Sequence, residues 1–427
     1  MEKLFKLSGH KTNVRTEVLA GVTTFLTMAY ILIVNPLILS DAGMDFGAVF
    51  TATALSSAIA TLVMAFWANL PFALAPGMGL NAFFAYAVVI SMGYSWQQAL
   101  TAVFIEGIIF IALTAFNIRE AIVNSIPLNV KKAISVGIGL FIAFIGLQNA
   151  GIIVGGATLV ELGDVTKGTA LVALIGLIIT SVLLAYKVRG ALLIGILLTT
   201  LVGIPLGVTS WAGGSWLPPS LKPTFMQFSF KDMFTIDMIV IIFTFLFVDM
   251  FDTVGTLIGC ATKADMLKED GTIPNVKEAL FADAIGTAVG AMLGTSTVTT
   301  YVESSAGIAE GGKTGLTSLV VAILFLVSLF LSPLFISVPG AATAPALVLV
   351  GLFMIGPVTQ IDFDEPTEAI PAFLTILFMV TSYSIANGIM YGVLSWIILK
   401  LAARKFKDIT ITTVIIAALL FIKFFIG

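Results

Sequence analysis

The sequence predicts an all-α polytopic membrane protein with fourteen transmembrane segments in two inverted seven-segment repeats. Three observations support this prediction: the composition, the spacing of apolar runs and a weak internal repeat. Of the 427 residues, 59% are hydrophobic and 11% are charged, and the mean hydropathy is +1.09. Such a composition excludes an ordinary water-soluble globular protein. Most of the chain is therefore expected to lie in a membrane.

Apolar runs long enough to cross a bilayer follow one another with short polar breaks. A helix needs roughly 20 residues to cross the hydrocarbon core. We expect segments at 18–39, 48–68, 71–92, 98–117, 131–150, 168–186, 190–208, 237–261, 278–294, 296–312, 315–336, 339–356, 368–383 and 386–403. A further apolar run at 409–426 is either a fifteenth span or an in-plane anchor, and the sequence leaves both open.

These segments divide the chain into five parts. They are a cytoplasmic tail (1–17), a first repeat (18–208), an extracellular or periplasmic connector (209–236), a second repeat (237–403) and a C-terminal tail with the extra apolar run (404–427). If the spans alternate, most of the 21 Lys and Arg residues lie on the side of the N-terminal tail. The positive-inside rule then predicts a cytoplasmic N-terminus in a multi-pass protein of the cytoplasmic (inner) membrane. No small-residue cleavage site follows the tail, so we interpret it as retained.

The two halves resemble each other weakly. "ALTAVFIEGIIFIALTAF" in the first half is similar to "GLTSLVVAILFLVSLFL" in the second, and Pro127 and Pro339 mark corresponding hairpins. Seven segments per half is an odd number, so the second half must enter the membrane the opposite way up. Inverted repeats are typical of secondary transporters, whose sites lie near the midplane at interrupted segments.

Two segments at repeat-related positions are interrupted. The third, "LPFALAPGMGLNAFFAYAVVISM", carries prolines and glycines, including Gly79, in its first half, and the tenth, "GTSTVTTYVESSAGIAEGG", predicts an extended piece followed by a half-helix. Asn81 and Glu303 fall where each half-helix is expected to begin, with backbone N–H groups free for a ligand. Ala82 and Tyr301 lie beside them. The alternative is a pair of irregular but purely structural helices.

The eighth segment, "IIFTFLFVDMFDTVGTLIGCA", contains two carboxylates where charge is costly. An Asp at a membrane centre costs about 3 kcal/mol on insertion scales. Asp249 and Asp252 are three residues apart and share one helix face, which Thr253 and Thr256 extend. Such a stripe cannot face lipid.

Asp283 in the ninth segment and Glu303 in the tenth add further carboxylates, and no Lys or Arg lies well inside these spans. Some of these groups must therefore be protonated, hydrated or held by bound substrate, as a proton-coupled site requires. We expect Asp252, Glu303 and Asp283 to be candidates for proton coupling. The alternative is that the polar groups only hold helices together, and Glu106 in the fourth segment is interpreted as such a structural hydrogen-bonder.

The expected pocket offers carboxylates, an amide, hydroxyls and peptide N–H groups but no cation. It suits a flat neutral heterocycle such as a nucleobase and disfavours anions. Phe83, Phe84, Phe251 or Tyr301 can stack on a ring. The single histidine, His10, lies in the tail, and the single cysteine cannot form an internal disulfide, so we expect no metal and no cofactor.

Several motifs resemble the AzgA-like purine permeases of the nucleobase–ascorbate transporter (nucleobase–cation symporter) superfamily. They are "GVTTFLTMAYILIVNP" (21–36), "ALAPGMGLNAFFAY" (73–86), "FVDMFDTVGTLIG" (247–259), "FADAIGTAVGAMLGTSTVTTYVESSAGIAEGG" (281–312) and "SIANGIMYG" (384–392), and together they cover nearly the whole chain.

The resemblance implies a core domain and a gate domain that move in an elevator-like cycle, often in a homodimer joined through the gate. It implies that Asp249 and Glu303 contact the purine, that Gly79 and Asn81 shape the site, and that Asp252 is needed for transport. Phe251 and Tyr301 near the site, with Thr253 and Asn387 as supporting residues, complete the predicted set of site residues.

The sequence therefore predicts a proton-driven importer of purine bases, hypoxanthine and guanine first and adenine as the alternative, that is not an enzyme and has no nucleic-acid partner. Coupling to sodium instead of protons stays open. Rival hypotheses are an anion exchanger on the same fold, disfavoured by the lack of core cations, and a passive channel. An intramembrane aspartyl protease is disfavoured because the chain has no Gly-x-Gly-Asp stretch and because Asp249 and Asp252 share one helix.

Overall fold

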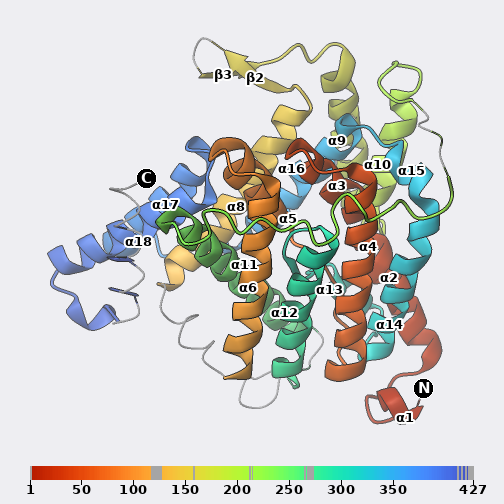
Figure 1. Cartoon of the computed structure of the whole chain (residues 1–427), viewed down its shortest axis with the longest axis horizontal. Helices are drawn as coiled ribbons and strands as arrows, with labels where there is room; N and C mark the ends of the chain where they lie inside the picture. Colours follow the sequence, from red (N-terminus) through yellow and green to blue (C-terminus); the bar gives the residue numbers. More distant parts are fainter. Residues whose placement is uncertain are drawn as a thin grey trace.

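Apolar helices dominate the computed structural model (Figure 1). It describes residues 2–116, 127–156, 159–210, 213, 215–263, 266, 274–410, 413, 414, 417, 418 and 421. In this part of the chain nine helices are long and apolar enough to cross a membrane, and shorter apolar helices lie at Met78–Ser91, Ala191–Gly203 and Pro366–Thr381. The all-α class is thus confirmed, whereas the count of fourteen spans stays a prediction.

The first half begins with a short helix and a long apolar helix that is interrupted at Ala29 and Tyr30. Its elements are α1 (Glu2–Phe5), α2 (Val14–Met28), α3 (Ile31–Asp41), α4 (Phe46–Val63), η1 (Met64–Ala68), β1 (Leu74–Pro76), α5 (Met78–Ala82), η2 (Phe83–Ser91), α6 (Trp96–Ala115), α8 (Leu128–Asn149), β2 (Ile153–Gly156), β3 (Leu159–Leu162), α9 (Gly168–Ala185) and α10 (Ala191–Gly203). The β2–β3 hairpin was not expected from the sequence.

In the second half, as in the first, two helical segments precede a short strand and a half-helix, but no hairpin corresponds to β2–β3 among the described residues. The elements of this half are α11 (Ile236–Lys263), α12 (Val276–Leu293), β4 (Val298–Thr300), α13 (Ser304–Ala309), α14 (Gly315–Ser328), η3 (Leu329–Leu331), α15 (Ser332–Ile336), α16 (Gly340–Met354), η4 (Gly356–Gln360), α17 (Pro366–Thr381), α18 (Ile385–Ala402) and η5 (Phe406–Asp408). Pro127 and Pro339, the predicted repeat-related prolines, are the residues that precede α8 and α16. Most of the apolar run 409–426 lies outside the described residues.

Helices of both halves mix in two bundles. We name the first the core bundle (α2–α6, α11–α15, β1 and β4) and the second the gate bundle (α8–α10 and α16–α18). In Figure 1 α17 and α18 lie at the left and α2 and α14 at the right. Within the gate bundle, α8 and α16 approach closely at glycines: a Cβ on Gly139 would lie 2.6 Å from the Gly351 carbonyl oxygen.

The two interrupted segments meet as an antiparallel pair of strands, and this confirms the predicted extended pieces. Leu74, Ala75 and Pro76 of β1 face Thr300, Thr299 and Val298 of β4. The peptide groups on the outer edges of the two strands do not pair with the other strand. Threonine hydroxyls of neighbouring helices bind them instead. Thr61 Oγ1 on α4 donates to the Leu74 carbonyl (3.3 Å) and accepts from its N–H (3.0 Å).

Thr287 Oγ1 on α12 repeats this arrangement on the other strand, with distances of 3.0 and 3.2 Å to the carbonyl and N–H of Val298. Unpaired backbone groups are costly away from water, so strands this short need such partners inside a membrane. The matching roles of Thr61 and Thr287 indicate the same structural repeat that the sequence showed weakly.

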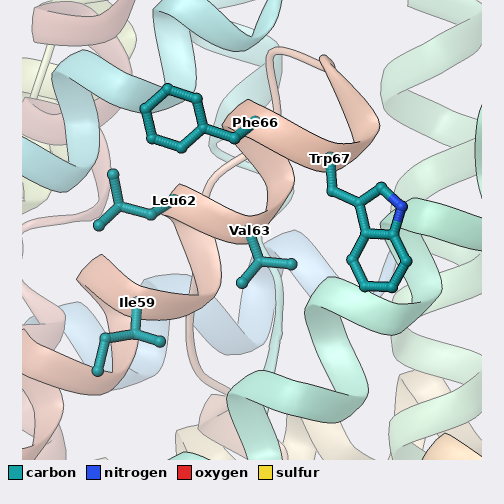
Figure 2. A pocket seen from close by; sticks show the side chains of 5 residues that line it. All are labelled: Ile59, Leu62, Val63, Phe66 and Trp67. Carbon is teal, nitrogen blue, oxygen red and sulfur yellow. The ribbon is translucent and has the colours of Figure 1, made fainter.

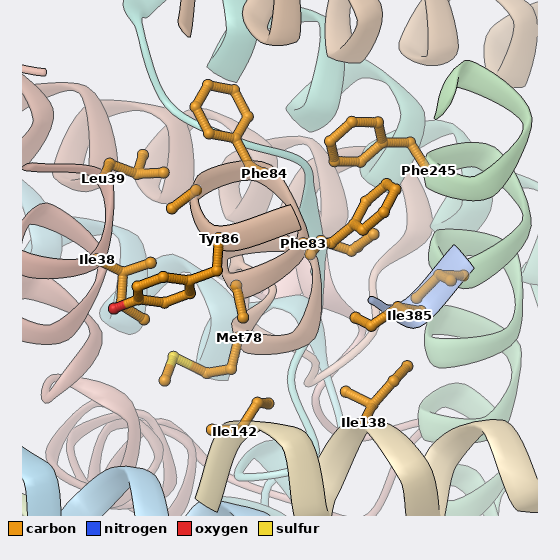
Figure 3. Close-up of a cluster of buried hydrophobic side chains, with 14 of the residues drawn as sticks. Ile38, Leu39, Met78, Phe83, Phe84, Tyr86, Ile138, Ile142, Phe245 and Ile385 are labelled. Carbon is orange, nitrogen blue, oxygen red and sulfur yellow. The ribbon is translucent and has the colours of Figure 1, made fainter. Parts of the chain in front are cut away.

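Apolar side chains fill the space between the bundles. Figure 3 shows Met78 of the core bundle beside Ile142 of the gate bundle, while the Phe83 ring points toward Phe245. Gly79 is also at this contact, since a Cβ there would lie 2.7 Å from Ile138 Cγ2. The half-helix α5 is thereby held against α8.

Candidate substrate site

A small cavity of about 80 Å³ lies where the strand crossing meets α16. The core bundle contributes most of the lining, and α16 contributes Val350, Phe353 and Met354. The volume is well below the roughly 300–1,000 Å³ of sites for drug-sized ligands, so its occupant must be small. The core-bundle residues that line it are Tyr30, Gly77, Met78, Gly79, Asp252, Thr256, Thr299, Thr300, Tyr301, Val302 and Glu303.

Two carboxyl groups share this cavity, Asp252 from α11 and Glu303 from the turn before α13. We call them the cavity pair. Thr299 Oγ1 donates to Asp252 Oδ2 at 3.3 Å, and the Tyr30 hydroxyl donates to Glu303 Oε1 at 2.7 Å. None of the lining residues is Lys, Arg or His. The cavity can therefore accept hydrogen bonds from a neutral or cationic ligand but offers no charge partner to an anion.

Tyr301 closes one side of the cavity. Its side chain is 5% exposed, and its hydroxyl donates to the Pro76 carbonyl at 2.6 Å. Gly77 has no room for a side chain, because a Cβ would lie 2.7 Å from Thr299 Cγ2. The Tyr301 hydrogen bond thus ties the two interrupted segments together, and Gly77 allows their close approach.

The other predicted carboxylates form a separate group that does not line the cavity. We call Glu106, Asp249 and Asp283 the buried cluster, because all three side chains are 0% exposed. Thr297 Oγ1 donates to Glu106 Oε2 at 3.2 Å. Thr253 Oγ1 donates to Asp283 Oδ1 at 2.9 Å and contacts Asp249 Oδ1 at 3.5 Å. The structure thus places Asp249, Asp283 and Thr253 behind the site, with Glu106 as the hydrogen-bonder expected.

Asn81 also lies behind the cavity. Helix α5 begins at Met78, so Asn81 is one turn further along than predicted, and its N–H donates to the Gly77 carbonyl at 2.8 Å. The prediction of a free N–H group at Asn81 is therefore wrong. Its side chain accepts a hydrogen bond from Ser296 Oγ and is fully buried, as is the neighbouring Ala82 at 1% exposure. The hydrogen bond to Asn81 ties α5 to the residues just before β4.

The half-helix α13 begins at Ser304, directly after Glu303, as the sequence predicts. The N–H groups of Ser304 and Ser305 donate to the carbonyls of Tyr301 and Val302 at 3.1 and 3.0 Å. The prediction that free N–H groups at this helix start face a ligand is therefore wrong for these two residues, because the tight turn uses them.

The remaining predicted residues lie elsewhere. Phe83 and Phe84 are fully buried in the apolar cluster of Figure 3, where Phe83 packs against Phe245 with ring centroids 4.8 Å apart. The Phe251 side chain lies outside the described part of the structure. Asn387 donates from Nδ2 to Ser382 Oγ at 3.2 Å in the gate bundle and does not line the cavity.

A larger pocket of about 500 Å³ is a poor candidate site. Ile59, Leu62, Val63, Phe66 and Trp67 line it (Figure 2). Phe66 and Trp67 are half exposed, and no lining residue can hold a charge. Such an apolar surface is typical of contact with lipid chains.

Three polar residues at the cavity, Tyr30, Thr299 and Thr300, were not predicted from the sequence. Tyr30 lies within an apolar span that was expected to run without interruption, and Thr299 is one of several threonines in the tenth segment. The signal for Tyr30 was a polar aromatic residue inside the motif "GVTTFLTMAYILIVNP", but only the tertiary packing brings it to Glu303.

Comparison with known proteins decides the family. The model of the Permease family (Xan_ur_permease) matches residues 15–391. The chain belongs to this family. A putative permease of Methanocaldococcus jannaschii is 52% identical to this permease over 426 residues, which is 99% of this chain and 98% of the relative.

Two further relatives carry more specific names. The adenine permease AdeP of Escherichia coli is 44% identical, covering 99% of this chain and 95% of its own length. The guanine/hypoxanthine permease PbuO of Bacillus subtilis is also 44% identical, covering 99% of this chain and 100% of its own length. The resemblance to AzgA-like purine permeases is confirmed, and the permease is a membrane transporter, not an enzyme.

A solved structure supports the fold. The transmembrane domain of the cyanobacterial bicarbonate transporter BicA superposes with a TM-score of 0.65 at 18% identity, covering 89% of the permease and 97% of that domain. At this identity the similarity concerns the fold alone.

Proposed function

We propose that the permease imports purine bases together with protons across the cytoplasmic membrane, with its N-terminus in the cytoplasm. The observation that carries the proposal is the cavity pair: Asp252 and Glu303 line one small cavity that has no cationic side chain. Two carboxylates in surroundings of low dielectric constant repel each other, so a proton or a ligand rich in N–H groups stabilises them.

Purines supply the complementary chemistry. Hypoxanthine and guanine carry a ring N–H beside a carbonyl, and a carboxylate can accept from such an N–H while a hydroxyl donates to the carbonyl. Relatives of the permease are named for guanine and hypoxanthine and for adenine. We propose the oxopurines as substrates and keep adenine as the alternative, because its exocyclic amine also suits a carboxylate.

The proposed cycle follows from the cost of moving charge through the membrane. Glu303 or Asp252 takes a proton on the outside, the base binds between the strand crossing and α16, and the site then crosses with one carboxyl group neutral and the other hydrogen-bonded to the base. An unloaded, doubly charged site is held back, since each carboxylate costs about 3 kcal/mol at the membrane centre. The core bundle carries the cavity past the gate bundle, as in an elevator, and the gate bundle joins two copies of the chain.

Uptake of labelled hypoxanthine in cells that lack their own purine carriers tests the proposal. We expect uptake to need the proton gradient, to persist when sodium is replaced, and to fall with excess unlabelled guanine but not with uracil or sulfate. Uptake blocked only by adenine would keep the mechanism and change the substrate. Dependence on sodium, inhibition by sulfate, or no purine uptake from protein shown to be in the membrane would contradict the proposal.

Glu303→Gln is the decisive variant, and Glu106→Gln is its matched control. Both remove the charge of a glutamate in the core bundle, but only Glu303 lines the cavity. We expect uptake per membrane-inserted molecule to vanish in Glu303→Gln and to persist in Glu106→Gln. Equal losses in the two variants would mean that the cavity pair has no special role.

A further inference from the structure

Tyr30 contacts Glu303 but belongs to neither of the two interrupted segments. It lies in the interruption between α2 and α3, and its side chain is 1% exposed. Its hydroxyl donates to Glu303 Oε1 at 2.7 Å, and both residues line the same cavity. One turn earlier, Thr27 Oγ1 approaches the backbone carbonyl oxygen of Glu303 at 3.5 Å. The helix pair α2–α3 therefore touches the glutamate at its side chain and at its backbone.

A single hydroxyl on one carboxylate oxygen makes the two oxygens of Glu303 different. Oε1 accepts from Tyr30, so the carboxyl plane is set by that bond, and Oε2 is the oxygen that a ligand can use. Hydrogen bonds to ionised groups are shorter and stronger than neutral ones, and they fix orientation better. An acceptor whose direction is fixed suits a flat ligand, whose N–H groups have fixed directions as well.

We infer that Tyr30 is a positioning residue for the substrate: it orients the Glu303 carboxyl so that Oε2 faces the N–H groups of the bound base. The inference rests on the proposed function, because it takes the cavity as the purine site. Tyr30 itself need not touch the base. Its loss leaves the carboxyl in place but free to rotate, so binding weakens while the charge of the site is unchanged.

A purely structural role is the competing explanation, in which the bond only ties α2 and α3 to α13. Such a role lowers the amount of folded protein and changes no property of the molecules that do fold. The two explanations therefore differ in KM per folded transporter and in the environment of the Glu303 carboxyl.

The test compares Tyr30→Phe with the matched control Tyr86→Phe. The control removes another buried phenolic hydroxyl in the core bundle that donates to a carboxylate, Asp41 Oδ2 at 2.7 Å, away from the cavity. KM and maximal rate of purine uptake are measured per membrane-inserted molecule. We expect Tyr30→Phe to raise KM about tenfold with a maximal rate within about threefold, because one bond to a charged group is lost. Tyr86→Phe should keep KM.

Infrared spectra of the purified variants provide a second readout that needs no substrate. The carboxyl band that Glu303→Gln removes should shift in Tyr30→Phe and stay in place in Tyr86→Phe. An unchanged KM together with an unchanged band would overturn the inference while the proposed function stands. A shifted band in a protein that transports no purine would overturn the proposed function. The orientation of the Glu303 carboxyl by Tyr30 would still stand.

Discussion

The cavity pair and the buried cluster contain the same chemical groups but differ in what surrounds them. Asp252 and Glu303 line a cavity and accept hydrogen bonds from Thr299 and Tyr30. The buried cluster of Glu106, Asp249 and Asp283 is fully enclosed, and Thr297 and Thr253 donate hydrogen bonds to Glu106 and Asp283. Hydroxyl donors therefore serve both groups, and access to a cavity is what distinguishes them.

The contrast is sharpest within α11, where Asp249 and Asp252 are three residues apart. Three residues at 3.6 per turn place two side chains about 60° apart around a helix axis, which is enough to give them different neighbours. A carboxylate pattern in a sequence therefore marks a helix face but does not say which member of the pattern meets a ligand.

Asp252→Asn should give the largest effect. The variant removes a charge from the cavity, and we expect purine uptake per inserted molecule to fall about 100-fold, the upper range for one bond to a charged group. Uptake in whole cells, corrected for surface amount, measures it. Near-normal uptake would mean that Glu303 alone binds the base and takes up the proton.

Gly79→Ala should lower uptake about tenfold by changing the contact between the bundles. The new Cβ would lie 2.7 Å from Ile138 Cγ2, so the two surfaces must separate or shift. Ile138→Ala removes the opposing atoms, and the double variant should regain most of the uptake. A double variant as slow as Gly79→Ala would show that the glycine is needed for another reason.

Asp249→Asn should affect stability more than transport. An amide can still donate or accept in the buried cluster, so we expect uptake within about threefold of the unmodified protein and a loss of about 1–3 kcal/mol in the free energy of unfolding. Thermal unfolding in detergent and uptake kinetics measure the two quantities. A large rise of KM at normal stability would instead place Asp249 at the substrate, as the family resemblance implies.

Glu365 supplies a comparison outside the membrane, where a carboxylate has the cation that the cavity pair lacks. Its Oε2 lies 2.8 Å from Lys405 Nζ, and the hydrogen bond to this lysine lowers the pKa of Glu365 to about 2. A lowered pKa stabilises the folded state above the unfolded pKa near 4.3, and the contribution is lost as the pH falls towards 2.

Glu365→Gln should therefore lower the melting temperature only slightly at pH 6, by no more than about 2 °C, because exposed ion pairs contribute little. The difference between the two proteins should disappear between about pH 4 and pH 2. Melting curves in detergent across this range measure it. A difference that persisted at pH 2 would assign the effect to the helix start at Pro366 instead of the ion pair.

Much of the fold could be predicted because the membrane imposes its length scale on the sequence. Apolar runs located the long helices to within a few residues, as for α11 and α12, and the glycines, prolines and threonines of the third and tenth segments located β1 and β4. The exposed β2–β3 hairpin was missed, since it lies outside the apolar runs.

The site could be predicted only in part. Glu303 and Asp252 were predicted because carboxylates are rare in a span, and Tyr301 and Gly79 because they lie in the interrupted segments; all four line the cavity. Tyr30 was missed because its role depends on a contact with a residue 273 positions away, which no local pattern reveals.

The pairing of β1 with β4 also sets an order of events during synthesis. Pro76 and Tyr301 are hydrogen-bonded although they are 225 residues apart, so the first interrupted segment enters the membrane long before its partner exists. At ribosomal rates the delay is about 10 to 45 seconds. During this interval the backbone groups of β1 that later face β4 need provisional partners, such as water or the insertion machinery. Two fragments separated in the connector 209–236 should each insert, but neither alone should build the cavity, and co-expression of both should restore it.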